Sequence, residues 1–253
     1  MLLKDKVIIV TGASSGIGAA AALRFAEQGA NLVLGARREA ELRKIEGQIT
    51  QSGGAALAVP GDVTEAGYAQ ALVEAAKERF GGLDGAFNNA GILGSGAMVA
   101  ETAFDEWEEV LATNLTASYH AARAQIPALR KRGGGSLVFT GSFVGQTATL
   151  PGMGAYAASK AGLVGLMQAI AVEHGAEGVR ANVLMPGGTM TPIAMDAATN
   201  PETAAFISGL HALKRMAQPE EIADAALFLL SDMASFVTGS AMLADGGNSI
   251  CKV

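Results

Sequence analysis

The stretch Val7-Ile8-Ile9-Val10-Thr11-Gly12-Ala13-Ser14-Ser15-Gly16-Ile17-Gly18 decides the fold of this chain. A β-branched run predicts a short strand, three glycines follow, and an Ala-rich helical stretch comes next. Glycines let the backbone turn tightly and approach a pyrophosphate, which binds the free N–H groups of the helix N-terminus. The spacing is GxxxGxG rather than GxGxxG, and a purely structural bend is the alternative, but the strand-turn-helix context favours a dinucleotide site. The residues that we assign to it here are Gly12, Ser14, Ser15, Gly16, Ile17 and Gly18.

The rest of the chain continues this alternation of short apolar runs with helical stretches. We expect strands at Val7–Val10, Asn31–Leu34, Ala55–Val59, Leu83–Phe87, Ser136–Thr140, Val179–Leu184 and Ala241–Ala244. We expect helices at Ala19–Gln28, Ala40–Gln51, Glu65–Phe80, Thr102–Tyr119, Ala155–His174 and Glu220–Leu230. Such alternation predicts right-handed βαβ units and a parallel sheet with helices on both faces.

Composition narrows the class of protein. A length of 253 residues with no linker-like segment favours one α/β domain. The formal net charge of -6 argues against nucleic acid as the main partner. Cys251 is the only cysteine, which excludes an intrachain disulfide and a cysteine-based metal site. His120, His174 and His211 have no metal-ligand spacing, so we expect no metal.

Without a signal-peptide pattern or a clear membrane span, we expect a cytoplasmic protein that does not bind membranes.

Residues at the ends of the second to fourth strands extend the cofactor site. The second strand ends in Arg37-Arg38 with no acid before Glu39. An acid there would bind the ribose 2′-hydroxyl of NAD, whereas arginines can hold the 2′-phosphate of NADP. We therefore expect the cofactor NADP(H), with NAD(H) as the alternative. A further alternative is that both arginines are exposed charges at the start of a helix and bind no ligand. The further candidates are Asp62 and Val63 for adenine, and Asn89, Ala90 and Gly91 after the fourth strand.

Tyr156-Ala157-Ala158-Ser159-Lys160 carries the candidate chemistry, because a helix places Tyr156 and Lys160 one turn apart on one face. A lysine charge about 4 Å away favours a phenolate by up to roughly 4 kcal/mol, or about three pKa units. That would bring the phenol pKa near working pH for acid-base catalysis. Most such Tyr/Lys pairs are packing contacts, so the assignment depends on other segments converging on the same site.

Those segments are present in the order typical of one family. TGASSGIG at 11–18, NNAG at 88–91, Asn114, Ser142, YAASK, Pro186-Gly187 and ADGG at 244–247 together resemble the short-chain dehydrogenase/reductase family, in particular the 3-oxoacyl-carrier-protein reductases. The resemblance covers nearly the whole chain. It implies a single doubly wound Rossmann-type domain over residues 1–253 with a seven-stranded parallel sheet. Cofactor binding would lie mainly in 1–120, and the catalytic residues and substrate lid mainly in 136–218.

The resemblance also implies residue roles. Tyr156 would exchange a proton with the substrate oxygen, Lys160 would lower the phenol pKa and bind the nicotinamide ribose, and Ser142 would hydrogen-bond the same oxygen. Asn114 would hold a water that links Lys160 to solvent. Pro186, Gly187, Thr189 and Thr191 would contact the nicotinamide end. The resemblance further implies a homotetramer whose interfaces use the helices at 102–125 and 155–174. The substrate would be a small carbonyl compound or alcohol.

Two features depart from the family pattern. The glycine turn lacks the basic residue that is common in NADP-dependent members, which weakens the NADP prediction. Fourteen positions separate Ser142 from Tyr156, one more than is usual for the family, which should reshape the substrate pocket. The long interval from Met190 to Gln218 is interpreted as a lid, with a plain surface excursion as the alternative. The rival functions are an NAD-dependent dehydrogenase for a cyclic alcohol and a non-catalytic nucleotide-binding scaffold. The substrate candidates are a 3-oxoacyl thioester, a cyclic or steroid-like ketone and a sugar-derived ketone.

Overall fold

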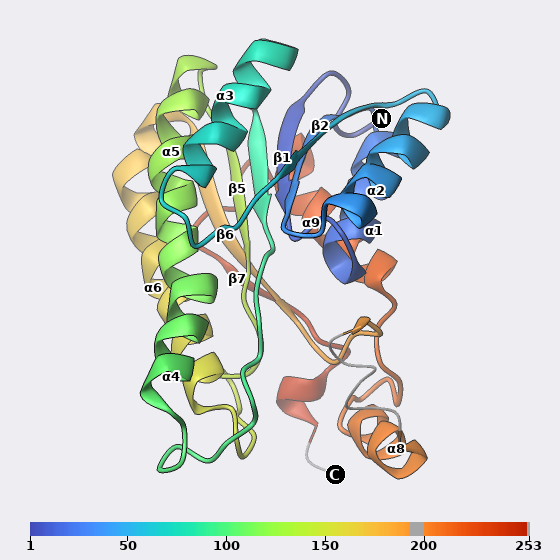
Figure 1. Cartoon of the computed structure of the whole chain (residues 1–253), viewed down its shortest axis with the longest axis vertical. Coiled ribbons are helices and arrows are strands. Elements are labelled where there is room, and N and C mark those ends of the chain that lie inside the picture. The colour runs from blue at the N-terminus through green and yellow to red at the C-terminus, as the bar shows by residue number, and fades with distance from the viewer. Residues whose placement is uncertain (193–199, 252–253) are drawn as a thin grey trace.

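The computed structural model describes residues 1–192 and 200–251. Its centre is a seven-stranded parallel sheet with the strand order β3-β2-β1-β4-β5-β6-β7 (Figure 1). The strands are β1 (Val7–Thr11), β2 (Asn31–Ala36), β3 (Ala55–Pro60), β4 (Gly85–Asn88), β5 (Gly135–Thr140), β6 (Val179–Pro186) and β7 (Ala241–Ala244). The order reverses between β1 and β4, and ligands bind at such a switch point, beyond the carboxyl ends of the strands. The predicted doubly wound sheet is confirmed.

Helices cover both faces of the sheet. They are α1 (Gly16–Glu27), α2 (Glu39–Gln51), α3 (Tyr68–Phe80), α4 (Phe104–Leu111), α5 (Ala117–Lys131), α6 (Gly154–His174), α8 (Pro201–Gly209) and α9 (Pro219–Leu230). Helices α1, α2 and α9 pack in one apolar core, and α3, α5 and α6 pack in the other. Strands such as β1 are buried along their whole length, because both of their faces are covered.

The main departure from the predicted elements lies between α4 and α5. We expected one helix ending at Tyr119, whereas a π-helical turn, Ala112–Thr116, joins α4 to α5 and the helix continues to Lys131. The π turn carries Asn114, which is 1% exposed. Single π turns of this kind are frequent at functional sites. Periodicity does not reveal them, because one extra residue in a turn leaves the apolar pattern on each side intact.

The expected lid contains α8, whose first turn is capped by the side chain of Asn200 accepting from the N–H of Glu202. Part of the lid, 193–199, lies outside the described residues. Beyond α8 the chain returns to the loop after β6 through an isolated bridge between Thr189 and Ala217.

One segment, Gly154–Glu177, is long and apolar enough to cross a membrane by length and composition alone. It contains α6, which carries buried Lys160 and packs against β6 in the core. Buried helices of globular proteins often have this length and composition, so we interpret the segment as a core helix.

Candidate active site

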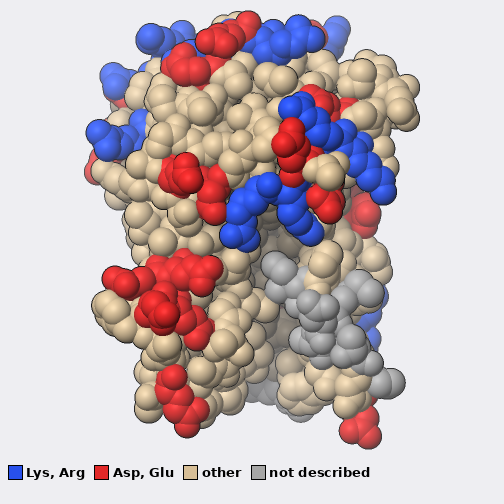
Figure 2. Space-filling model, in the orientation of Figure 1, with Lys and Arg blue, Asp and Glu red and all other residues tan. Residues whose placement is uncertain are grey.

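A cleft of about 710 Å³ opens at the carboxyl ends of the strands. Figure 2 shows it as a hollow with Lys or Arg side chains at its upper rim. Of the residues predicted for the site, all but Gly18 and Asn114 line this cleft. Segments from residue 12 to residue 248 therefore converge on one cavity.

The glycine turn leaves space where side chains would intrude. A Cβ on Gly12 would lie 3.0 Å from Nδ2 of Asn89, and one on Gly16 would lie 3.1 Å from Cγ2 of Thr191. Both residues also have positive φ angles, 67° and 55°. Gly18 serves packing instead, because a Cβ there would overlap the carbonyl oxygen of Gly12 at 2.2 Å. The first N–H groups of α1 have no partners within their own helix, so the turn fits a pyrophosphate.

Two arginines stand at the end of β2. Arg38 Nη2 donates to the hydroxyls of Ser14 at 3.0 Å and Ser15 at 2.5 Å. Arg37 Nη1 lies 3.7 Å from a carboxylate oxygen of Asp62. Hydrogen bonds from Thr64 hold the pKa of Asp62 below its usual value, and Arg37 adds to this shift. The rim therefore combines two cations and two hydroxyls with one ionised carboxylate.

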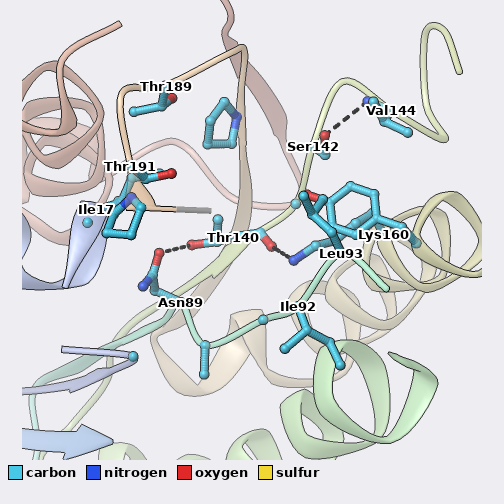
Figure 3. A pocket seen from close by; sticks show the side chains of 18 of the residues that line it. Ile17, Asn89, Ile92, Leu93, Thr140, Ser142, Val144, Lys160, Thr189 and Thr191 are labelled. Carbon is cyan, nitrogen blue, oxygen red and sulfur yellow. Dashed lines mark hydrogen bonds between the residues drawn. The ribbon is translucent and has the colours of Figure 1, made fainter. Parts of the chain in front are cut away.

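The Asn88-Asn89 pair ties the strands together at the bottom of the cleft. Asn88 exchanges two amide hydrogen bonds with Gln125 of α5, at 2.9 and 3.0 Å. The N–H of Asn89 donates to Oγ1 of Thr11, and its Oδ1 accepts from Oγ1 of Thr140 at 3.1 Å (Figure 3). Asn89 thus joins β1 to β5 beneath the site.

Lys160 is buried and its Nζ donates to the carbonyl oxygen of Thr140 at 2.7 Å (Figure 3). The same Nζ lies 5.5 Å from the centre of the Tyr156 ring. Burial lowers the pKa of Lys160 to about 8. Helical spacing therefore does bring the phenol and the amine together.

The expected lowering of the Tyr156 pKa is not found. Burial raises the pKa of the phenol, and interaction with the Ser142 side chain only partly offsets this rise. The physical reason is that Lys160 directs its amine at Thr140 and is itself desolvated. The hydroxyl oxygen of buried Ser142 accepts from the N–H of Val144 at 3.1 Å, which fixes the strand-end turn.

Asn114 does not line the cleft but forms hydrogen bonds to residues next to it. Its side chain accepts from the N–H of Ile92 at 2.9 Å, and its amide donates to the Ile92 carbonyl and to Oγ of Ser159. Ser159 in turn donates to the carbonyl oxygen of Tyr156 at 2.7 Å. Asn114 thus connects the loop after β4 to the helix turn that carries the phenol. The sequence reasoning missed Ser159 and Thr140, although both sit beside predicted residues.

The loop after β6 closes the cleft above. The Thr189 hydroxyl donates to the Gly187 carbonyl at 3.0 Å, and Thr191 lines the cleft beside the glycine turn. His211 is buried, with Nε2 accepting from the N–H of Gly188 at 3.0 Å and Nδ1 lying 2.9 Å from the Ile207 carbonyl. These contacts require a neutral ring with the proton on Nδ1. The histidine thus connects the end of α8 to the loop after β6.

The half of the cleft beyond Ser142 is lined mainly by apolar side chains that the sequence reasoning did not assign. They are Leu93, Phe143, Val144, Leu150, Met153, Phe206, Ile207 and Leu210. They come from three loops and α8, so no single motif marks them. Within 1–192 and 200–251, no three His, Cys, Asp or Glu residues form a metal-binding group.

Known proteins resemble this chain along nearly its whole length. The family model described as Enoyl-(Acyl carrier protein) reductase matches residues 12–249. Cyclohexanol dehydrogenase of Acinetobacter sp. (strain SE19) is 38% identical over 96% of this chain and 94% of that protein. A-factor type gamma-butyrolactone 1′-reductase (1S-forming) of Streptomyces virginiae is 40% identical over 98% and 97%. 3beta-Hydroxysteroid dehydrogenase 1 of Eggerthella lenta is 37% identical over 98% and 95%.

Solved structures agree with these relatives. The crystal structure of levodione reductase matches with a TM-score of 0.94 and 33% identity, covering 99% of this chain and 100% of that one. The match of fold, motif order and cleft leads to one conclusion: the chain belongs to the short-chain dehydrogenase/reductase family, whose members are NAD(P)(H)-dependent oxidoreductases acting on alcohol and carbonyl groups.

Proposed function

We propose that this protein interconverts a cyclic ketone and the corresponding secondary alcohol with NADP(H), and that residues 1–253 act as one catalytic unit. The observation that carries the proposal is the convergence of Ser142, Tyr156 and Lys160 on one wall of the cleft that begins at the glycine turn. The relatives named for cyclohexanol, a gamma-butyrolactone and a hydroxysteroid support a ring substrate.

Tyr156 acts as the proton donor and acceptor. In reduction its hydroxyl donates a proton to the substrate carbonyl oxygen, and in oxidation the phenolate accepts the alcohol proton. The Ser142 hydroxyl donates a hydrogen bond to the same oxygen and stabilises charge that develops there. The bound nicotinamide supplies or accepts the hydride. Lys160 holds a positive charge beside the phenol and offers donors to the nicotinamide ribose.

The cofactor would lie along the cleft in contact with residues from each βα loop. Its pyrophosphate fits the turn of Gly12, Ser14, Ser15, Gly16 and Ile17, and Gly18 supports that turn by close packing. Asp62 and Val63 would hold the adenine. The loop residues Asn89, Ala90, Gly91, Pro186, Gly187, Thr189 and Thr191 would contact the nicotinamide half.

The preference for NADP(H) rests on the rim of the cleft. Arg37 and Arg38 with the Ser14 and Ser15 hydroxyls form a donor set suited to a dianionic 2′-phosphate. Arg37→Asp should reduce kcat/KM for NADPH at least about tenfold relative to NADH, because it removes a cation and adds a repulsive charge. Lys44→Asp is the matched control, since Lys44 is exposed on α2 and does not line the cleft. An unchanged NADPH to NADH ratio in Arg37→Asp would reject the arginine assignment.

The second candidate is an NAD-dependent dehydrogenase of the same fold. The Arg37–Asp62 ion pair favours it, because a partnered guanidinium is less available to a phosphate. Wild-type protein assayed with NADPH and NADH against a panel of cyclic ketones, read at the absorbance of the reduced nicotinamide, separates these two readings. Absence of turnover with both cofactors, with cofactor binding retained, would instead support a scaffold role.

The proposal includes a homotetramer in the cytoplasm. The outward face of α6 carries exposed Gly165, Ala169 and Val172, which suits close packing with a second copy. Gly162 is explained within one chain, since a Cβ there would lie 2.8 Å from Leu115. A sedimentation measurement giving a monomer at micromolar concentration would reject the tetramer.

A further inference from the structure

We propose that the substrate half of this cleft selects for electrical neutrality: it takes apolar, uncharged ring ketones and alcohols and rejects carboxylates, phosphate esters and thioesters on a phosphopantetheine arm. This inference rests on the proposed function and adds the chemistry of the substrate. It is carried by the polarity of the cavity lining and by the charge of the surrounding walls.

The lining offers few polar partners beyond the reacting oxygen. Among the described residues beyond Ser142 and Tyr156, the polar side chains that line this half are those of His211 and Asn248. Both ring nitrogens of His211 are engaged with Ile207 and Gly188. A sugar-derived ketone would bury several hydroxyls here with too few partners, at a cost of about 1–3 kcal/mol for each unpaired group.

Charge is distributed unevenly along the chain. Lining residues of the cleft come from 92–113, which includes α4, from 141–156, and from 186–192 and 200–211, which include α8. These ranges contain no Lys or Arg and six acids. The six are Glu101, Asp105, Glu106, Glu108, Glu109 and Glu202.

The acids on the α4 side stand beside the cleft. Figure 2 shows acidic side chains gathered on the surface to the left of the hollow, in the region where Figure 1 places α4. Glu106 fixes this wall, because its carboxylate accepts from the Ser95 hydroxyl at 2.8 Å in the loop that continues from Leu93. The cationic rim of Arg37 and Arg38 lies at the other end of the cleft, where the cofactor phosphates would use it.

An anionic substrate would meet two penalties. Acidic walls repel it on approach, an effect that extends about 10 Å at 0.1 M salt. Inside the cavity its charge would lose water, while the cations that line the cleft lie at the phenol (Lys160) and at the cofactor end (Arg37 and Arg38). The same penalties apply to the phosphates of coenzyme A thioesters. Of the three substrate candidates, the neutral cyclic ketone is therefore the one that the cleft accepts.

The test compares two probes of similar size, methyl 4-oxocyclohexanecarboxylate and 4-oxocyclohexanecarboxylate, with wild-type protein and saturating NADPH at pH 7. We expect kcat/KM for the ester to exceed that for the carboxylate by roughly a hundredfold. Raising the ionic strength from 0.05 to 0.5 M should increase kcat/KM for the carboxylate several-fold and leave the ester unchanged. Equal values for the two probes would overturn the inference.

A binding measurement distinguishes a failure of this inference from a failure of the proposed reaction. Calorimetric titration of the two probes into NADPH-loaded Tyr156→Phe protein measures charge preference without turnover. Tighter binding of the ester with no wild-type turnover would refute the reaction and keep the selectivity. Equal binding of both probes, or of neither, would refute the selectivity.

A charge variant gives a direct control. Phe206 lines the cleft and is 63% exposed, so a lysine there can reach solvent and the mouth. Phe206→Lys should raise the carboxylate-to-ester ratio of kcat/KM at least about tenfold. Phe206→Met should leave the ratio unchanged, as should Gln51→Lys, which adds the same charge to an exposed site at the end of α2. A ratio that rises equally in Gln51→Lys would assign the effect to net charge alone.

Discussion

The Nζ of Lys160 donates a 2.7 Å hydrogen bond to the carbonyl oxygen of Thr140, the last residue of β5. Because the Thr140 hydroxyl also donates to Asn89, one residue connects Lys160 to the loop after β4. The lysine is thereby held by the sheet itself, and its desolvation becomes a measurable property of the folded protein.

Stability should depend on pH through Lys160. Burial lowers its pKa from 10.5 to about 8, so between these values the unfolded chain binds more protons than the folded one, and stability rises with pH. Below pH 8 the full penalty of roughly 3 kcal/mol applies. The free energy of unfolding of Lys160→Met relative to wild type should therefore fall by about 2–3 kcal/mol from pH 7 to pH 10. Urea unfolding at both pH values measures this.

The matched control for that experiment is Lys44→Met, because Lys44 is exposed on α2. The pH dependence of the Lys160→Met difference is read against the difference that Lys44→Met shows over the same pH range. If Lys160→Met behaves like Lys44→Met, the lysine is not desolvated in the folded protein.

Removing the phenolic hydroxyl should separate chemistry from binding. Tyr156→Phe should lower kcat by at least about a hundredfold, because no group at that position can exchange a proton. Cofactor affinity, measured by fluorescence titration, should remain within a few-fold of wild type. In wild type, alcohol oxidation should accelerate as pH rises, since burial raises the pKa of the phenol that must ionise. A pH-independent oxidation rate with chemistry limiting would contradict this role.

Asn114 should be important for stability as well as activity. Asn114→Ala leaves the N–H and carbonyl of Ile92 without these partners and should cost about 2–4 kcal/mol. Ser118→Ala removes only one hydroxyl bond to the Asn114 carbonyl and should cost about 1 kcal/mol. Chemical denaturation of both variants checks the order, and equal losses would show that the amide network contributes little.

Two helix glycines should respond in opposite directions to alanine. Gly18→Ala places a Cβ against the Gly12 carbonyl and should destabilise by about 1–3 kcal/mol while weakening cofactor binding. A Cβ on Gly47 meets nothing within 4 Å, so Gly47→Ala should stabilise α2 by about 0.5–1 kcal/mol. Thermal melting distinguishes them, and a stabilised Gly18→Ala would contradict the packing role of that glycine.

Local patterns in the sequence were sufficient to predict the sheet and most of the cleft. The glycine turn, the Arg37-Arg38 pair and the Tyr156/Lys160 spacing are each set within a few residues, and parallel strands bring their carboxyl ends to one edge. The partners of Lys160 and Asn114 were not predicted, because Thr140, Ile92 and Ser159 meet them through tertiary contacts. The direction of the Tyr156 pKa shift was wrong for a related reason: burial depends on the packed environment, which spacing does not report.

The π turn at 112–116 has a consequence for how this chain tolerates change in length. Each helical residue advances the side-chain direction by about 100°. Because the π turn holds one residue more than an α turn, deleting one of its residues would leave the direction of α5 nearly unchanged and Gln125 still beside Asn88. The same deletion would shift Asn114 relative to Ile92, its partner in two hydrogen bonds. The π turn is therefore the place where this helix can lose one residue without repacking α5, and its extra residue serves the position of Asn114 rather than the core.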